Sequence, residues 1–95
     1  MPAASRLRRG WCLYLVKCAD DTLYTGITND LQRRIAQHNN GTASRYTRSR
    51  LPVELVYCEG CRDKSGALKK EYQVKSLTRK TKEAYIAGKA RPRTS

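Results

Sequence analysis

The strongest constraint on the fold is a short run near the start of the chain, WCLYLVKC at residues 11–18. Strand-forming residues occupy both alternating sets of positions in this run, so both of its faces are suited to burial. A strand of this kind belongs in the middle of a sheet. A chain of 95 residues can bury only one modest core, so we expect one small domain built around this strand.

Two further strands are predicted from alternation and turn signals. Residues 22–27, TLYTGI, follow the first strand after a turn at residues 19–21, which makes a hairpin the expected connection. Residues 53–60, VELVYCEG, alternate apolar and polar positions and predict a third strand with one buried face.

Three helices are predicted around these strands. The first covers about residues 30–40, with Asn29 or Asp30 as its N-cap and Gly41 as its left-handed C-terminal cap. Residues 42–52 are predicted to be a loop. The other two helices run from an Asp63 cap to about Leu77, and from Thr78 or Thr81 through Ile86. The order β-β-α-β-α-α predicts an α+β fold, a small three-stranded antiparallel sheet flanked by helices.

The charge of the chain predicts a polyanionic partner. The net charge is +12, from 20 Lys and Arg against 8 Asp and Glu. Residues 1–10 and 87–95 each carry three basic residues, no acid and no apolar periodicity, so we predict flexible basic arms on either side of a folded domain at residues 11–86. A membrane surface is a poorer match, because no predicted helix sets a wide apolar face beside a basic one.

The four cysteines are expected to be reduced thiols. The sequence has no membrane-spanning apolar run and no signal peptide, so we expect a cytoplasmic location. Cys58 and Cys61 have zinc-knuckle spacing, but Cys12 and Cys18 lie about 20 Å apart along an extended strand. That is too far for one zinc tetrahedron unless the chain bends sharply near Cys18.

The first predicted helix places polar groups beside its apolar face. Leu31 and Ile35 are four residues apart and share one face. Arg34 lies three residues after Leu31, and His38, the only histidine of the chain, lies four residues after Arg34. Both polar side chains are therefore expected on or near the side of the helix that packs on the sheet.

The second predicted helix repeats this feature with a carboxylate. Glu71 falls within the apolar stripe formed by Leu68 and Val74, with Ala67 and Lys75 close by. Burial of an unpaired carboxylate costs free energy, so Glu71 needs either a partner or a metal ion. A partly exposed pair with Lys75, four residues on, is the alternative.

These polar residues carry a resemblance to a known family. Cys12-Leu13-Tyr14, ten residues before Tyr24-Thr25-Gly26, resembles the paired signature of the GIY-YIG nuclease superfamily. Arg34, His38 and Glu71 stand where that family keeps an arginine, a histidine and a metal ligand. Framework positions differ from the signature, but both tyrosines and Gly26 are present. The match covers about residues 11–86 and resembles the small stand-alone bacterial members of the YhbQ type.

The resemblance implies a metal-dependent nuclease that hydrolyses phosphodiester bonds in DNA. Glu71 would hold Mg²⁺ or Mn²⁺, and Arg34 would clamp the scissile phosphate. Tyr14 would act as general base, with Tyr24 hydrogen-bonded to it or to the attacking water. His38 would orient the phosphate or aid proton transfer. The choice between the tyrosines stays open, because a one-residue change in hairpin register would put them on opposite faces.

Substrate binding is assigned to a basic loop and to basic residues of the last two helices: Arg45, Tyr46, Arg48, Arg50, Lys75, Arg79, Lys80 and Lys82. We expect a monomer that acts on single-stranded DNA with little sequence specificity, because stand-alone relatives include such nucleases. The alternatives are a nuclease for flapped or branched DNA, and a nucleic-acid-binding module that keeps the fold without turnover. RNA stays open as a ligand.

Overall fold

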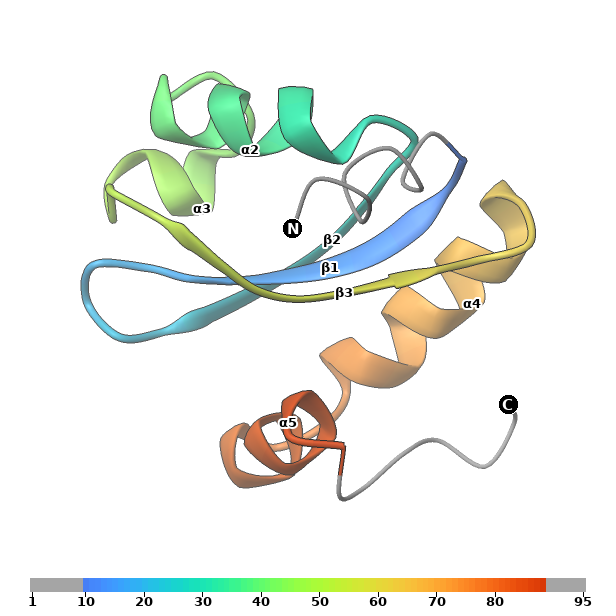
Figure 1. Cartoon of the computed structure of the whole chain (residues 1–95). Helices are drawn as coiled ribbons and strands as arrows, with labels where there is room; N and C mark the ends of the chain where they lie inside the picture. Colours follow the sequence, from blue (N-terminus) through green and yellow to red (C-terminus); the bar gives the residue numbers. More distant parts are fainter. Residues whose placement is uncertain (1–9, 89–95) are drawn as a thin grey trace.

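The computed structural model describes residues 10–88 and contains one three-stranded sheet with helices on both faces (Figure 1). The predicted arms at residues 1–10 and 87–95 lie almost entirely outside the described residues. The strands are β1 (Cys12–Lys17), β2 (Leu23–Thr28) and β3 (Glu54–Gly60), in the spatial order β2-β1-β3. Both pairings are antiparallel, so the predicted α+β fold and its central strand are confirmed.

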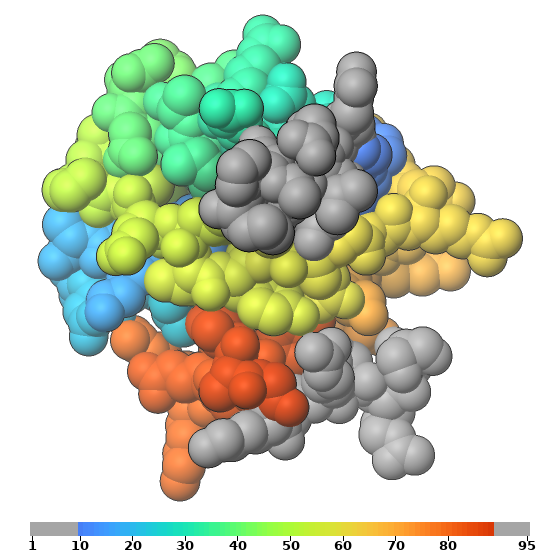
Figure 2. Space-filling view, in the orientation of Figure 1, coloured from blue at the N-terminus to red at the C-terminus, as the bar shows by residue number. Residues whose placement is uncertain are grey.

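The helices form one layer on each side of the sheet. Helices α2 (Leu31–Asn39) and α3 (Arg45–Arg48) cover one face, and α4 (Lys64–Lys75) and α5 (Arg79–Ile86) cover the other (Figure 1). At the surface, β3 crosses between the two layers as an edge strand (Figure 2). No helix within residues 10–88 is both long and apolar enough to cross a membrane.

Side-chain alternation along β1 divides the core into two clusters. Cys12, Tyr14 and Val16 pack toward α2, in a cluster that includes its residue Leu31. The intervening residues Leu13 and Leu15 pack toward α4 and α5, in a second cluster that includes Val74 and Tyr85. All five of these β1 residues are buried, which accounts for an apolar run with no polar face.

The helix ends follow the predicted capping chemistry. Asp30 accepts from the backbone N–H of Arg33 at the start of α2, and Asp63 accepts from the N–H of Gly66 at the start of α4. Gly41 follows α2 with φ of 78°, and its N–H donates to the carbonyl of His38, as expected of a left-handed helix terminus.

Three predictions about local structure were wrong. The predicted single buried face of β3 is not formed, because a register shift interrupts its pairing with β1, leaves Leu55 38% exposed and places Val53 and Tyr57 in different core clusters. Residues 42–52 are not only a loop, because Ser44 accepts from the N–H groups of Tyr46 and Thr47 and starts the four-residue helix α3. A helix of one turn is too short to leave an apolar period in the sequence. In α4, Leu68 is 47% exposed and does not belong to the buried stripe. That stripe is Ala67 and Val74, with Glu71 between them.

Candidate active site

The centre of the candidate site is a hydrogen bond between β1 and the last turn of α2. The hydroxyl oxygen of Tyr14 lies 2.8 Å from Nε2 of His38. Tyr14 is 2% exposed and His38 is 1% exposed, so neither group exchanges this contact for water. His38 therefore lies on the side of α2 that packs on the sheet, as expected from its spacing, and its partner there is Tyr14.

The imidazole of His38 is bonded on both sides. Its Nδ1 lies 2.8 Å from Oγ1 of Thr47, a fully buried residue of α3. Burial lowers the pKa of His38, and the positive charge of Arg34 lowers it further, so the ring is neutral near pH 7. Sequence reasoning missed Thr47, because it lies in a four-residue helix among arginines and has no periodic neighbours.

Gly26 provides the space that the Tyr14 ring occupies. Tyr14 on β1 stands directly opposite Gly26 on β2, and a Cβ atom on Gly26 would lie only 2.5 Å from the Tyr14 hydroxyl oxygen. Any side chain at this position would displace the phenol. The glycine of the second triplet is thus required by close approach rather than by an unusual backbone angle.

The hairpin register places both tyrosines on the same face. Tyr24 is opposite Val16, and Val16 belongs to the same cluster as Tyr14. The Tyr24 ring meets the His38 ring edge-on at 5.3 Å between centroids. Within residues 10–88, the Tyr24 hydroxyl has no hydrogen-bond partner, whereas the Tyr14 hydroxyl has His38. The two tyrosines are therefore chemically different.

Arg34 and Glu71 approach Tyr14 from opposite layers of the fold. Burial raises the pKa of Tyr14 above its ordinary value, and Tyr24 adds to this rise. The charge of Arg34 lowers the same pKa and that of Glu71 raises it, so both charges act on the phenol. The five residues predicted to form the catalytic set thus lie in one neighbourhood.

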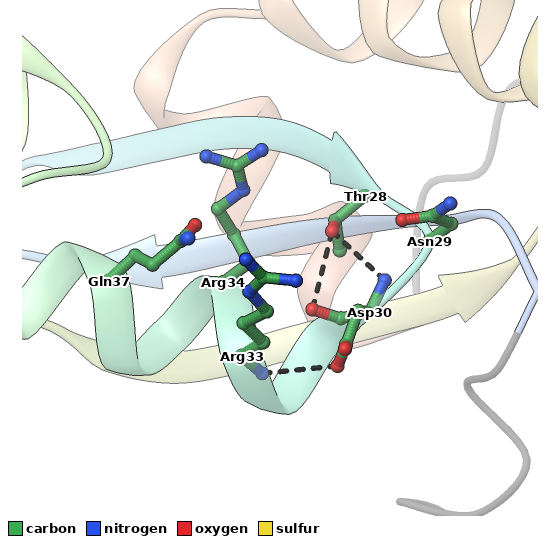
Figure 3. A pocket seen from close by; sticks show the side chains of 6 residues that line it. All are labelled: Thr28, Asn29, Asp30, Arg33, Arg34 and Gln37. Carbon is green, nitrogen blue, oxygen red and sulfur yellow. Dashed lines mark hydrogen bonds between the residues drawn. The ribbon is translucent and has the colours of Figure 1, made fainter.

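The guanidinium of Arg34 faces a shallow pocket of about 210 Å³ at the end of β2. Figure 3 shows Arg33, Arg34 and Gln37 projecting from α2 at this pocket, which Asp30 also lines. Within the described part of the chain, the Arg34 side chain has no hydrogen bond or ion pair. It is therefore available to an anion.

The Glu71 carboxylate is only partly exposed, at 19%, and lies 3.3 Å from the ammonium group of Lys75. The alternative considered for Glu71, a partly exposed pair with Lys75, is therefore present. Among residues 10–88, no three His, Cys, Asp or Glu side chains gather as a metal site. Any metal held at Glu71 would have one protein carboxylate and would take its other ligands from water and substrate, an arrangement that suits Mg²⁺.

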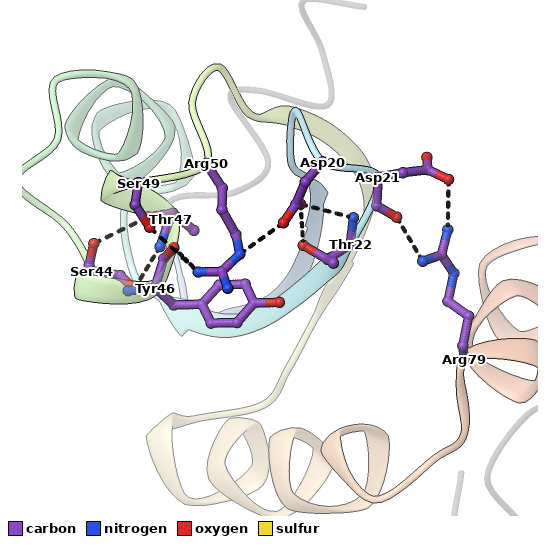
Figure 4. Close-up of polar contacts among 9 residues, drawn as sticks. All are labelled: Asp20, Asp21, Thr22, Ser44, Tyr46, Thr47, Ser49, Arg50 and Arg79. Atoms are coloured by element: carbon purple, nitrogen blue, oxygen red, sulfur yellow. Dashed lines mark hydrogen bonds and ion pairs between the residues drawn. The ribbon is translucent and has the colours of Figure 1, made fainter.

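Several of the predicted DNA-binding residues already have partners in the protein. Arg50 pairs with Asp20 at 2.9 Å, donates to the carbonyl of Tyr46 and lies 3.9 Å from the centroid of the Tyr46 ring (Figure 4). Arg79 donates to the carbonyl of Asp21 and pairs with Glu83. These two arginines tie α3 and α5 to the β1–β2 turn.

The ring of Tyr46 already has two neighbours in the protein. Arg50 lies over one face, and Tyr24 stacks with the ring at 5.8 Å between centroids. Arg50 therefore occupies a face of Tyr46 on which an unpaired base would otherwise stack. Among the predicted DNA-binding residues, the exposed cations without a partner within residues 10–88 are Arg45, Arg48 and Lys80. Burial lowers the pKa of Lys82, and its neighbours Lys75 and Arg79 lower it further.

The cysteines are distributed over both layers. Cys12, Cys18 and Cys58 belong to the cluster beneath α2, whereas Cys61 packs in the cluster beneath α4 and α5. Burial raises the pKa of the Cys61 thiol, and the charge of Glu59 raises it further. The zinc-knuckle pair of the sequence is therefore split between opposite faces of the sheet.

Comparisons with known proteins give the family to which this chain is similar. The profile of the GIY-YIG catalytic domain matches residues 10–84. The chain is 57% identical over 72 residues to UPF0213 protein DP2720 of Desulfotalea psychrophila, covering 75% of this chain and 66% of that protein. It is 46% identical over 92 residues to a UPF0213 protein of Vibrio cholerae, covering 96% and 91%. The solution structure of UPF0213 protein BH0048 from Bacillus halodurans superposes with a TM-score of 0.55 at 39% identity, over 86% of this chain and 87% of that one.

Proposed function

Because this chain belongs to the GIY-YIG catalytic domain family, a family of nucleases, we propose that it is a metal-dependent nuclease acting on DNA. The observation that carries the proposal is the buried Tyr14–His38 hydrogen bond between the charges of Arg34 and Glu71. We further propose single-stranded DNA as the substrate, with flapped or branched DNA as the alternative.

Tyr14 serves as the proton acceptor through His38. A buried phenol whose pKa is raised does not ionise alone near pH 7. It accepts a proton from the attacking water while its own proton passes to Nε2 of His38, which is neutral and 2.8 Å away. The hydroxide equivalent bonds to phosphorus as the bond between phosphorus and the leaving oxygen breaks, and the leaving oxygen takes a proton from water. The protein is left with an imidazolium ion and a neutral Tyr14. Tyr24, whose hydroxyl has no partner within residues 10–88, orients the water.

Arg34 binds the scissile phosphate. Its guanidinium stays charged at all relevant pH values and can donate to two phosphate oxygens at once. These donors stabilise the negative charge that grows on the phosphate in the transition state. Arg33 lines the same pocket and adds a second positive charge, whereas Asp30, which caps the start of α2, adds one negative charge.

Glu71 fits Mg²⁺ or Mn²⁺ as the single protein ligand. The fit rests on a hard carboxylate oxygen that is partly exposed and is held by Lys75 alone within the described residues. When bound, such an ion supplies Lewis-acid stabilisation of the phosphate and the leaving oxygen. Lys75 and Arg79 lie close enough to Lys82 for their charges to lower its pKa, so the metal-binding carboxylate would have a group of cations beside it for the substrate backbone.

A second candidate is a nucleic-acid-binding module without turnover. The observation that favours it is the burial of Tyr14 and His38, since a general base must meet its water. Both candidates predict DNA binding, and only the first predicts cleavage.

The test compares Glu71→Ala with Glu54→Ala, an exposed position on β3 at the sheet edge. Cleavage of end-labelled single-stranded, duplex, flap and junction DNA, with RNA included, is measured with Mg²⁺ and with EDTA. We expect Glu71→Ala to bind DNA but not to cleave it, and Glu54→Ala to behave as wild type. Full activity of Glu71→Ala would show that the Glu71 carboxylate is not part of the active site. Binding without cleavage by the wild type on every substrate would establish the second candidate.

A further inference from the structure

We propose that Thr47 is a positioning residue that holds His38 in the tautomer protonated at Nδ1, so that Nε2 is free to accept the Tyr14 proton. The catalytic consequence rests on the proposed nuclease function. The tautomer itself is a property of the free protein and is testable without substrate.

The direction of the hydrogen bonds follows from the donors and acceptors present. Thr47 Oγ1 lies 2.8 Å from His38 Nδ1 and 3.4 Å from the carbonyl oxygen of Ser44. A carbonyl oxygen only accepts, so the Thr47 O–H donates to Ser44 and its oxygen accepts from Nδ1–H. The lone pair of Nε2 then accepts from the Tyr14 O–H. In this series of hydrogen bonds, every donor has an acceptor.

The opposite tautomer leaves a buried donor without an acceptor. If Nε2 carried the proton, it would donate to the Tyr14 oxygen, and the Tyr14 O–H would have to point elsewhere. Tyr14 is 2% exposed, and within residues 10–88 its hydroxyl has only His38 as a hydrogen-bond partner. Leaving a buried hydroxyl without a hydrogen-bond partner costs free energy. The protein environment therefore selects the tautomer with Nδ1–H.

The short helix α3 supports this arrangement. Ser44 caps it, so that Thr47 is held three residues on and fully buried against His38. On its outer side, Arg50 bonds the Tyr46 carbonyl and pairs with Asp20 in the β1–β2 turn (Figure 4). The segment around α3, which the sequence analysis assigned to DNA binding, thus holds the His38 ring at its Nδ1 side.

The experiment measures the His38 tautomer directly. His38 is the only histidine of the chain, so with a tag that contains no histidine, long-range ¹H–¹⁵N spectra report a single imidazole. Wild type, Thr47→Val and Thr47→Ser are compared, because valine keeps the shape of threonine and serine keeps its hydroxyl. Thr25→Val is the matched control, since Thr25 is also buried but its hydroxyl has no partner within residues 10–88.

We expect pyrrole-type Nδ1 and pyridine-type Nε2 signals in wild type, Thr47→Ser and Thr25→Val. In Thr47→Val the two tautomers should mix, and kcat should fall about ten- to a hundredfold with KM unchanged. Thr47→Ser should keep most of the wild-type kcat. A wild-type ring protonated at Nε2 overturns the inference even if Thr47→Val does not fold. So does a folded Thr47→Val with wild-type tautomer and kcat. If the wild type has the expected tautomer but no cleavage, the nuclease proposal fails and the positioning by Thr47 stands.

Discussion

The hydroxyl oxygen of Tyr14 and Nε2 of His38 lie 2.8 Å apart, in a part of the core where each residue is at least 98% buried. The contact joins the central strand to the last turn of α2, 24 residues away in the sequence. In the proposed mechanism it distinguishes Tyr14 from Tyr24, because only the phenol with an imidazole partner can pass its proton on. The Tyr24 ring meets the same imidazole edge-on.

Replacing Tyr14 by Phe should remove the proton path. We expect kcat to fall about 10²–10⁴-fold, the range that general acid–base catalysis supplies. Stability should fall by about 1 kcal/mol, because Nε2 of His38 loses its donor. Tyr72→Phe removes a hydroxyl from a side chain that is 79% exposed and serves as the control. Unchanged cleavage by Tyr14→Phe would transfer the role of base to another residue.

Gly26→Ala should have a similar effect without removing a functional group. The new Cβ would lie 2.5 Å from the Tyr14 hydroxyl oxygen and 2.6 Å from Cζ, so the phenol must leave its position beside His38. We expect kcat to fall by at least tenfold and stability to fall by about 1–3 kcal/mol from overpacking. Gly10→Ala has no atom within 4 Å of its added Cβ and is the control. Wild-type activity in Gly26→Ala would mean that the position of the phenol does not matter.

The sheet was predictable because its signals are local. β1 is apolar at every alternate position on both faces, and Asp30 and Asp63 cap their helices by a side chain that is visible in the sequence. The strand β3 was also found, but not the register shift that breaks its alternation. The five candidate catalytic residues were found through their spacing and the family resemblance. Their convergence on Tyr14 depends on hairpin register, which the sequence left open.

The supporting contacts could not be predicted in the same way. The bond between Thr47 and His38 and the pair between Arg50 and Asp20 join residues 9 and 30 positions apart, through a one-turn helix with no periodic pattern. An arginine near a tyrosine has the same sequence signal whether it binds DNA or covers the ring. The prediction that Leu68 is buried was wrong although its spacing from Glu71 and Val74 fitted the apolar stripe. In the structure, α4 places this side chain in solvent.

Thr25→Val should stabilise the protein. The Thr25 hydroxyl is buried and has no hydrogen-bond partner within residues 10–88, while valine keeps the β-branched shape that suits a strand. Removing an unsatisfied buried hydroxyl should contribute about 1 kcal/mol, which raises Tm by about 4–8 °C in a domain of this size. Calorimetry of the variant beside Thr81→Val, whose hydroxyl bonds Thr78 at the start of α5, gives the comparison. A lower Tm for Thr25→Val would show that the hydroxyl has a partner.

The free energy of unfolding should depend on pH through Glu59, which accepts a hydrogen bond from Tyr85 of α5. Burial raises the pKa of its carboxyl, but bonds from Tyr85, Tyr57 and Lys70 outweigh burial and lower it overall. The unfolded chain therefore binds more protons in acid. The stabilisation is present above the ordinary glutamate pKa, about 4.3, and is lost as the pH falls below it. In Glu59→Gln the free energy of unfolding should vary less with pH between about 3 and 5 than in wild type, whereas Glu54→Gln at the exposed edge should match wild type.

Binding to DNA should depend on the cations that the fold leaves unpaired. Arg45, Arg48 and Lys80 are exposed and have no partner within residues 10–88, whereas Arg50 and Arg79 are held by Asp20, Asp21 and Glu83. On a single strand, each phosphate contact contributes about 0.7 to the slope of log affinity against log salt. The double variant Arg45→Ala/Arg48→Ala should therefore lower that slope by about 1.4.

Arg50→Ala provides the contrast for this prediction, because its charge is already paired. It should destabilise the fold and uncover one face of Tyr46, while the salt slope should stay near that of wild type. With the ring open, affinity for single strands should rise relative to duplex, since only unpaired bases can stack on it. Salt titrations by fluorescence anisotropy on one strand, with and without its complement, measure both effects. A slope that falls equally in Arg50→Ala and in the double variant would mean that Arg50 leaves Asp20 to contact phosphate, and the Arg45–Arg50 segment would then be a DNA-binding loop after all.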